Sequence, residues 1–124
     1  MEEKEFGRDI IESYGLDVDF DPLLSADLTN GVRSSEFTVS RNGETYKSEF
    51  QWGSGIDSND LDESDVVYSL ITDWNLYYFD PNEAFSMFED IDKWNRYMEE
   101  IKFLESIFSE SEADEIMEKY QKIY

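Results

Sequence analysis

The sequence predicts an α+β fold in which a small antiparallel sheet is covered by four to five helices. Around Asn42-Gly43, two segments of alternating apolar and polar residues meet at a two-residue turn, which is typical of a β-hairpin. After Gly55, apolar residues recur every three or four positions, which is typical of amphipathic helices. A chain of 124 residues is expected to form a single domain, residues 1–124, around one core.

The first part of the chain is expected to contribute a helix and a strand. Apolar residues at helical spacing predict a helix from Glu2 to Tyr14, with Gly15 placed to end it. Residues 16–20 alternate between apolar and acidic types and end before Pro22, which predicts a third strand, since an isolated hairpin is marginally stable. Residues 23–32 are expected to form a loop. Its three leucines are expected to pack against the core: Leu23, Leu24 and Leu28.

The turn sets the register of the hairpin. With Asn42-Gly43 at the tip of a type I′ turn, Val39 lies opposite Tyr46, and Phe37 lies opposite Ser48. The alternation of both strands then places one set of side chains in the core: Phe37, Val39, Tyr46, Phe50 and Trp52. The other set faces water: Thr38, Ser40, Thr45, Lys47 and Glu49. The turn and the alternation agree, so we expect one buried and one wet face.

Four further helices are predicted. The first carries an apolar stripe over residues 66–74. Residues 80–83 read Asp-Pro-Asn-Glu and predict a second start, with the aspartate at the N-cap and proline at the first helical position. A longer helix is expected over 92–108, and the last begins near Ser109 or Ser111.

An aromatic-rich stretch lies between the first two of these helices. Residues 74–79 are expected to be core plus a helix-to-helix connection. Six apolar or amphipathic residues in a row cannot all point inward. One or two of the last three are therefore expected to be exposed and able to anchor an interface: Tyr77, Tyr78 and Phe79.

The composition excludes several functional classes. The chain has 31 acidic and 10 basic residues, a net charge of -21, yet its nine Phe, eight Tyr and three Trp favour a folded core. It has no cysteine for disulfides or thiolate chemistry, and no histidine, the commonest metal ligand and neutral-pH general base. No apolar run is long enough to span a membrane, and the first five residues do not resemble a signal peptide, so we expect a cytoplasmic protein.

No motif in the sequence points to catalysis or to a dedicated metal site. With so many carboxylates, pairs arise by chance and do not indicate a glycosidase. Residues 57–65 fail the EF-hand pattern in both registers: Leu61 would occupy a ligand position in one, and Asp65 the glycine position in the other. This segment is better interpreted as a solvated loop in which Asp62 or Ser64 caps the next helix. We expect a protein that is not an enzyme and has no cofactor; a small enzyme is the third-ranked alternative.

The distribution of the acidic residues is the main functional signal. Eleven acids lie between Phe50 and Trp94 with no lysine or arginine before Lys93, so pairing along a helix cannot neutralise them. They are Asp57, Asp60, Asp62, Glu63, Asp65, Asp73, Asp80, Glu83, Glu89, Asp90 and Asp92. A second run without a base is formed by Glu105, Glu110, Glu112, Asp114, Glu115 and Glu118. An ordered array of carboxylates could occupy the Lys and Arg arrays with which proteins bind DNA.

These properties resemble those of the phage-encoded DNA-mimic proteins, which include inhibitors of restriction enzymes and anti-CRISPR proteins. The chain is also similar, from Phe37 to Phe108, to small uncharacterised proteins of phages and plasmids. Four segments carry this second likeness: residues 37–43, 50–55, 65–73 and 84–88. Those proteins commonly have Gly-Tyr-Asp after the last of these segments, where this chain has Glu89-Asp90-Ile91-Asp92. The resemblance implies a role in phage–host conflict and transfers no catalytic residue.

Together, charge and resemblance predict an anti-CRISPR inhibitor in the bacterial host cytoplasm. It would bind the basic nucleic-acid-binding surface of a Cas effector, or of another defence nuclease, and block target DNA. The eleven acids, with Tyr77 and Tyr78, are the expected contact residues. Direct binding to nucleic acid or to a membrane is not expected, and the protein would be a monomer or a homodimer. The alternatives are inhibition of a restriction enzyme, or a noncatalytic adaptor that binds a host protein through exposed aromatic side chains.

Overall fold

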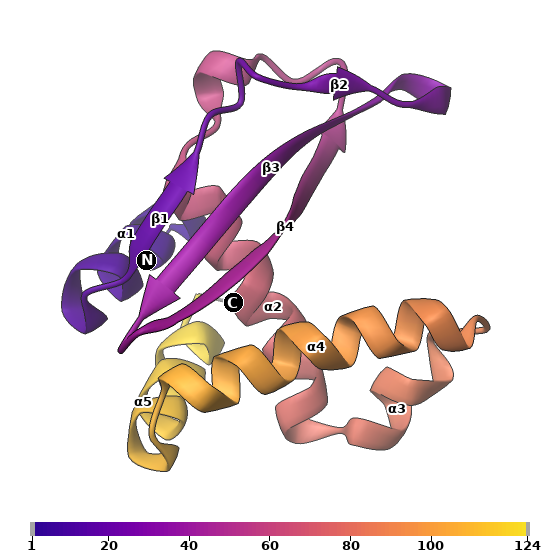
Figure 1. Ribbon diagram of the computed structural model, residues 1–124. Coiled ribbons are helices and arrows are strands. Elements are labelled where there is room, and N and C mark those ends of the chain that lie inside the picture. Colours follow the sequence, from indigo (N-terminus) through magenta and orange to yellow (C-terminus); the bar gives the residue numbers. More distant parts are fainter. Residues whose placement is uncertain (1, 124) are drawn as a thin grey trace.

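The computed structural model describes residues 2–123 and has the predicted α+β fold (Figure 1). The elements follow one another in the order α1 (Glu3–Tyr14), β1 (Asp17–Phe20), β2 (Ala26–Asp27), β3 (Val32–Arg41), β4 (Glu44–Gly53), α2 (Glu63–Phe79), α3 (Pro81–Ser86), α4 (Ile91–Ile107) and α5 (Glu110–Gln121). Short 3₁₀ turns lie at Thr29–Gly31 and Ser58–Asp60. No helix among the described residues is long and apolar enough to cross a membrane.

The sheet is antiparallel and is built around β3. One edge of β3 pairs with β4 along the whole hairpin, and the other edge pairs with β1 and then with the two-residue strand β2. The predicted register is confirmed, because Val39 lies opposite Tyr46. Asn42 and Gly43 both have positive φ, 55° and 81°, as a type I′ turn requires.

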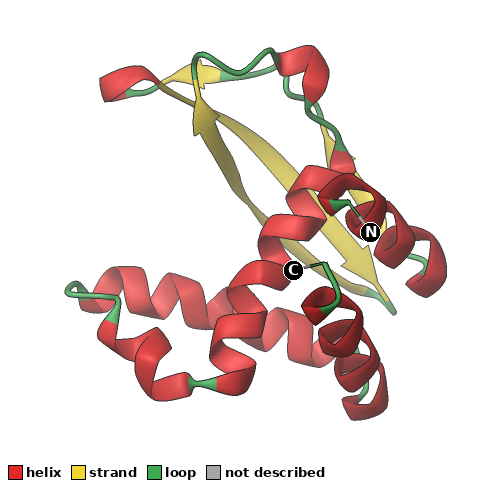
Figure 2. Ribbon diagram, turned by 180° about the vertical axis from the view of Figure 1, so that it is seen from behind, coloured by secondary structure: helices red, strands yellow, loops and turns green. Residues whose placement is uncertain are grey.

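The helices gather on one face of the sheet, with α2 at their centre (Figures 1 and 2). This helix contacts α1, α3, α4, α5 and β1. Phe37, Val39 and Trp52 face the helices and are buried, whereas Thr45 and Lys47 on the opposite face are exposed. The expectation of one buried and one wet face is therefore confirmed.

The ends of the helices follow the predicted sequence signals. Gly15 adopts a left-handed conformation, φ 65°, and ends α1. Asp62 or Ser64 was expected to cap α2; Asp62 is the cap and forms a capping box with Asp65. Asp80 caps α3 by accepting a hydrogen bond from the Glu83 backbone N–H. These side-chain caps satisfy backbone N–H groups that have no partner within the helix.

Two expectations from the sequence are wrong. Leu23, Leu24 and Leu28 do not pack on the core: 68%, 75% and 43% of their surfaces are exposed. This segment is attached to β3 by the pairing of β2 and by a hydrogen bond that the Ser35 hydroxyl donates to the Leu24 carbonyl oxygen. Because these contacts involve backbone groups of the segment, they leave the leucine side chains in solvent. Residues 74–79 were expected to be core plus a helix-to-helix connection; Trp74 is buried, but all six residues belong to α2, and the expected connection is absent there. The helix runs on to Phe79 because it contains no glycine or proline, and it ends before Asp80, which precedes a proline.

Among the contacts that hold the N-terminal helix and the hairpin to the rest of the molecule, those of Gly7 and Arg41 are especially close. At Gly7 the backbone of α1 lies so close to α2 that an added Cβ would lie 2.1 Å from the Ser64 carbonyl oxygen. At the tip of the hairpin, Arg41 donates two hydrogen bonds to the Glu112 carboxylate, at 2.9 and 2.8 Å. The same guanidinium donates to the Tyr14 carbonyl oxygen at 2.7 Å. Arg41 therefore connects β3 with α1 and α5.

Candidate protein-binding surface

The fold divides the acidic run of residues 57–92 into two groups. The N-terminal acidic group, at the start of α2, consists of Asp57, Asp60, Asp62, Glu63 and Asp65. The C-terminal acidic group, beyond the other end of α2, consists of Asp80, Glu83, Glu89, Asp90 and Asp92. The 17 residues of α2 separate the two groups by about 25 Å along the helix axis. The run is thus two surfaces, with Asp73 between them on α2.

The N-terminal acidic group is partly neutralised by α1. Asp65 forms an ion pair with Lys4 at 2.6 Å, and Asp62 forms one with Arg8 at 3.3 Å. Partial burial acts to raise the pKa of Asp62, but hydrogen bonds from Ser64 and the charges of Lys4 and Arg8 outweigh it and lower this pKa. The other three members of the group are exposed and form no ion pair with another described residue: Asp57, Asp60 and Glu63.

The C-terminal acidic group is not neutralised in this way. All five carboxylates are exposed, and within residues 2–123 none of them forms an ion pair. Asp80 and Asp90 each use one oxygen to cap a helix, α3 and α4 respectively. Lys93 is the nearest basic residue in the sequence and is exposed. Five carboxylates on two helix starts and the turn between them can bind several Lys or Arg side chains of a partner.

The second acidic run is largely used inside the molecule. Four of its six carboxylates have partners within the chain: Glu112 with Arg41, Asp114 with Tyr78, Glu115 with Tyr14, and Glu118 with Lys122. Burial and the hydrogen bond to Glu115 raise the pKa of Tyr14 to about 12, so this hydroxyl remains a donor at neutral pH. The run therefore offers fewer free carboxylates than its sequence indicates.

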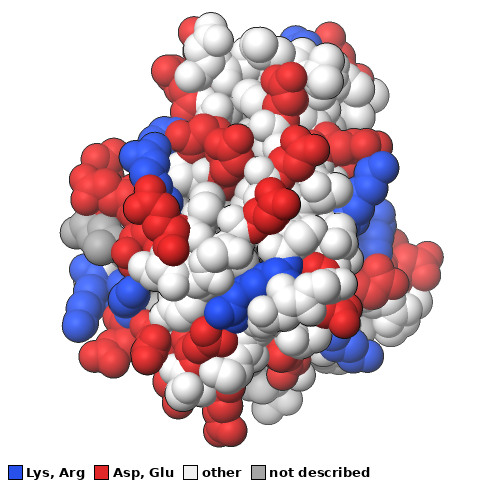
Figure 3. Space-filling view, turned by 60° about the vertical axis from the view of Figure 1, so that its left-hand side comes forward, with Lys and Arg blue, Asp and Glu red and all other residues white. Residues whose placement is uncertain are grey.

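Most of the basic residues are also used internally. Seven of the ten lysines and arginines form ion pairs in the described part of the chain: Lys4, Arg8, Arg33, Arg41, Lys47, Lys119 and Lys122. On the face shown in Figure 3, carboxylates are spread over much of the surface and are separated by uncharged side chains and a few basic ones. On this face the negative charge is therefore displayed in separate groups, and not as one continuous patch.

Asp73 differs from the other predicted contact residues because its carboxyl group is withdrawn from the surface. It hydrogen-bonds with Glu100 of α4, and both side chains are only partly accessible. Burial, together with the close approach of a second carboxyl group, raises the pKa of Glu100, so that the pair holds one proton at neutral pH. A cavity of about 370 Å³ adjoins the pair and is also lined by Tyr46, Lys93 and Arg96. Asp73 is thus an internal contact between α2 and α4.

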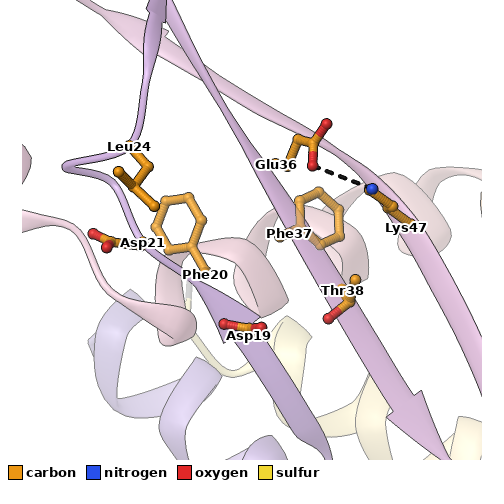
Figure 4. A pocket seen from close by; sticks show the side chains of 8 residues that line it. All are labelled: Asp19, Phe20, Asp21, Leu24, Glu36, Phe37, Thr38 and Lys47. Carbon is orange, nitrogen blue, oxygen red and sulfur yellow. Dashed lines mark ion pairs between the residues drawn. The ribbon is translucent and has the colours of Figure 1, made fainter.

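A second hollow, of about 490 Å³, lies beside β1 and β3 (Figure 4). Three carboxylates line it, those of Asp19, Asp21 and Glu36, and its lysine, Lys47, is paired with Glu36 at 3.3 Å. This lining attracts cations and repels anionic substrates. Within the described residues, no group of three or more Asp or Glu is arranged to hold a metal ion.

The aromatic residues predicted as contacts have different environments. Tyr77 is half-buried and packs against the core. Tyr78 is exposed, but its hydroxyl donates a hydrogen bond to Asp114. Close to these aromatic residues in the sequence, the structure adds three exposed apolar residues that were not expected: Phe85, Met87 and Ile91. The shortness of α3 could have revealed them, because a six-residue helix cannot bury every apolar residue around it.

Comparison with known proteins finds no matching family model, no matching curated protein and no matching solved structure. The function must therefore be inferred from the surfaces of the molecule itself.

Proposed function

We propose that the protein is a noncatalytic inhibitor that binds the basic nucleic-acid-binding surface of a defence nuclease, most specifically a Cas effector, in place of target DNA. One observation carries this proposal: the five carboxylates of the C-terminal acidic group are exposed, close in sequence and outside any ion pair in the described chain. Carboxylates in this state are available to the lysines and arginines that otherwise contact DNA phosphates.

The net charge supports the same function. A charge of -21 on 124 residues creates a strong negative field, which would speed association with a basic partner and discourage contact with nucleic acid or anionic membranes. Since each helix start is held by a side-chain cap, the C-terminal acidic group is also preorganised and loses little conformational freedom on binding.

In this mechanism the protein competes with DNA for one set of basic side chains. The exposed members of the N-terminal acidic group, about 25 Å from the C-terminal group along α2, would provide a second contact. Because B-DNA carries one charge per ~1.7 Å of its axis, that spacing is equivalent to about seven base pairs of duplex. A basic channel of that length could contact both groups.

The test is a competition experiment with purified Cas effector–guide complexes. Fluorescence anisotropy of a labelled target duplex would report its displacement by increasing concentrations of the protein. The informative variant neutralises the C-terminal acidic group through Asp80→Asn, Glu83→Gln, Glu89→Gln, Asp90→Asn and Asp92→Asn. Asparagine caps a helix about as well as aspartate, so α3 and α4 should be retained. We expect the variant to compete at least about tenfold less well.

A matched control neutralises five exposed carboxylates elsewhere and has the same net charge: Glu12→Gln, Asp17→Asn, Asp19→Asn, Glu44→Gln and Glu49→Gln. This control should compete almost as well as the unmodified protein. Equal losses in both variants would show that only total charge matters and would refute a specific contact at α3. Failure to displace DNA from any of the Cas effector–guide complexes tested would refute the proposed target.

A further inference from the structure

Exposed apolar side chains lie among the residues of the C-terminal acidic group. Phe79 at the end of α2, Phe85 on α3, Met87 just after it and Ile91 at the start of α4 are 54%, 57%, 64% and 63% exposed. Large apolar side chains that are exposed together on a small protein often mark an interaction site. We call these four residues the α3 apolar cluster.

This cluster rests on a packed aromatic base. The rings of Phe85 and Trp94 meet edge to face with their centroids 5.0 Å apart. Phe88 packs against both Trp94 and Tyr97, at 5.8 and 5.0 Å. The helices on either side are capped by Asp80 and by Asp90. The exposed side chains are therefore presented from an ordered surface, which lowers the entropy lost on binding.

The charges near the α3 apolar cluster limit the kinds of partner that can bind there. The five carboxylates of the C-terminal acidic group are interspersed with the residues of the cluster along positions 79–92, and two basic residues, Lys93 and Arg96, line a cavity beside Met87. A second copy of the chain would bring another -21 of charge to the same place, and an anionic lipid surface would also be repelled. An apolar centre within a polar, charged rim is the usual anatomy of a protein–protein interface. Here the five neighbouring carboxylates favour a partner rich in lysine and arginine.

We propose that the α3 apolar cluster is the centre of the binding surface, and that it receives apolar side chains from a protein segment whose flanking residues are lysine or arginine. This inference rests on the proposed function, because it places the contact within the same acidic group. It adds that the partner is recognised as a protein. Part of the affinity then comes from the burial of apolar surface and persists at high salt. An inhibitor that imitated only the DNA phosphates would lack this contribution.

Two synthetic peptides of equal length and equal positive charge provide the test. One combines lysine with serine, and in the other leucine replaces serine along one face of a helix. Calorimetry should show that the lysine–leucine peptide binds the full-length protein at least about tenfold more tightly, since the leucine side chains bury apolar surface that the serine side chains lack. Backbone NMR shifts caused by this peptide should centre on residues 79–93.

Variants separate this surface from the other exposed apolar region. Met87→Ser with Ile91→Ser should abolish the preference for leucine, whereas Leu23→Ser with Leu24→Ser, which changes two equally exposed residues, should preserve it. Circular dichroism would check that each variant is folded. Equal binding of both peptides, or shifts centred on Leu23 and Leu24, would overturn the inference. The inference would also be overturned if sedimentation showed concentration-dependent dimers that the Met87 and Ile91 changes convert to monomers. The α3 apolar cluster would then bind a second copy of the chain.

The peptide experiment and the DNA competition can fail independently. A leucine preference at α3 without displacement of DNA from any Cas effector would support this surface and refute only the choice of nuclease. Displacement of DNA without a leucine preference would leave the proposed function in place and refute the apolar contact.

Discussion

Replacing Glu100 by glutamine should stabilise the protein at neutral pH. Glu100 and Asp73 hydrogen-bond through a shared proton, and burial raises the pKa of Glu100 above its ordinary value of 4.5. At pH 7 the unfolded chain releases this proton, so folding must take it up again. Over roughly 2.5 pH units, at about 1.4 kcal/mol per unit, that uptake costs about 3 kcal/mol. The amide introduced by Glu100→Gln would donate to Asp73 without taking up a proton.

The gain should depend on pH with a definite sign. A carboxyl group whose pKa is raised by folding contributes stability that is complete below its unfolded pKa and declines as pH rises toward its folded pKa. Glu100→Gln should therefore match the unmodified protein near pH 4 and exceed it by up to about 3 kcal/mol at pH 7. Urea unfolding followed by circular dichroism between pH 4 and 8 measures this difference.

Glu99→Gln is the matched control, because Glu99 is the exposed neighbour on the same helix. It should change the free energy of unfolding by less than about 0.5 kcal/mol at every pH. If the Glu100 variant is no more stable than the unmodified protein at pH 7, or if its advantage is the same at pH 4 and pH 7, the shared proton is refuted.

Two further predictions concern the contacts that hold the fold together. Gly7→Ala should destabilise the protein by about 1–3 kcal/mol, because the added methyl group would force α1 away from Ser64. Gly55→Ala is the control and should be nearly neutral, because its methyl group meets open space. Equal urea midpoints for the two variants would contradict the close packing at Gly7. Arg41→Lys should cost about 2–4 kcal/mol, since lysine cannot replace the two parallel hydrogen bonds to Glu112. Hydrogen bonds from Arg41 hold the pKa of Glu112 at about 2, so its NMR titration should move toward 4.5 in the variant; an unchanged titration would contradict the assigned contact.

The Glu112 contact also has a pH dependence, opposite in sign to that of Glu100. A lowered carboxyl pKa gives stability that is present above the unfolded value of 4.5 and is lost as pH falls toward 2. Acid should therefore weaken the attachment of the hairpin tip to α5 first. Hydrogen exchange of the amides at residues 40–44 between pH 5 and 3 would detect this loosening, and protection that stays constant over this range would count against it.

Local signals account for the parts of the fold that could be predicted. The Asn42-Gly43 turn determines the hairpin register within a few residues of itself, and the caps at Asp62 and Asp80 act over two or three positions. Gly15 ends α1 for the same local reason. The turn, the two caps and the end of α1 each depend on the local backbone conformation, which is determined by residues close in the sequence. The loop leucines were misplaced because their burial depends on what the fold brings over them, and nothing in the described chain covers Leu23 or Leu24.

The candidate site was only partly predictable for a related reason. The sequence shows eleven acids without a neighbouring base, but it does not show that Lys4 reaches Asp65 across 61 positions. Nor does it show that Asp73 meets Glu100 of another helix. Ion pairs between distant segments decide which carboxylates remain available, so the C-terminal acidic group could be distinguished from the N-terminal group only in three dimensions.

The salt dependence of binding to a Cas effector–guide complex tests the central claim most directly. If the C-terminal acidic group replaces DNA phosphates, the logarithm of the affinity should fall steeply and linearly with the logarithm of the salt concentration. The slope should become clearly shallower when the five carboxylates of that group are neutralised. The same slope for the unmodified protein and for this variant, at any affinity, would show that these carboxylates do not contact the partner.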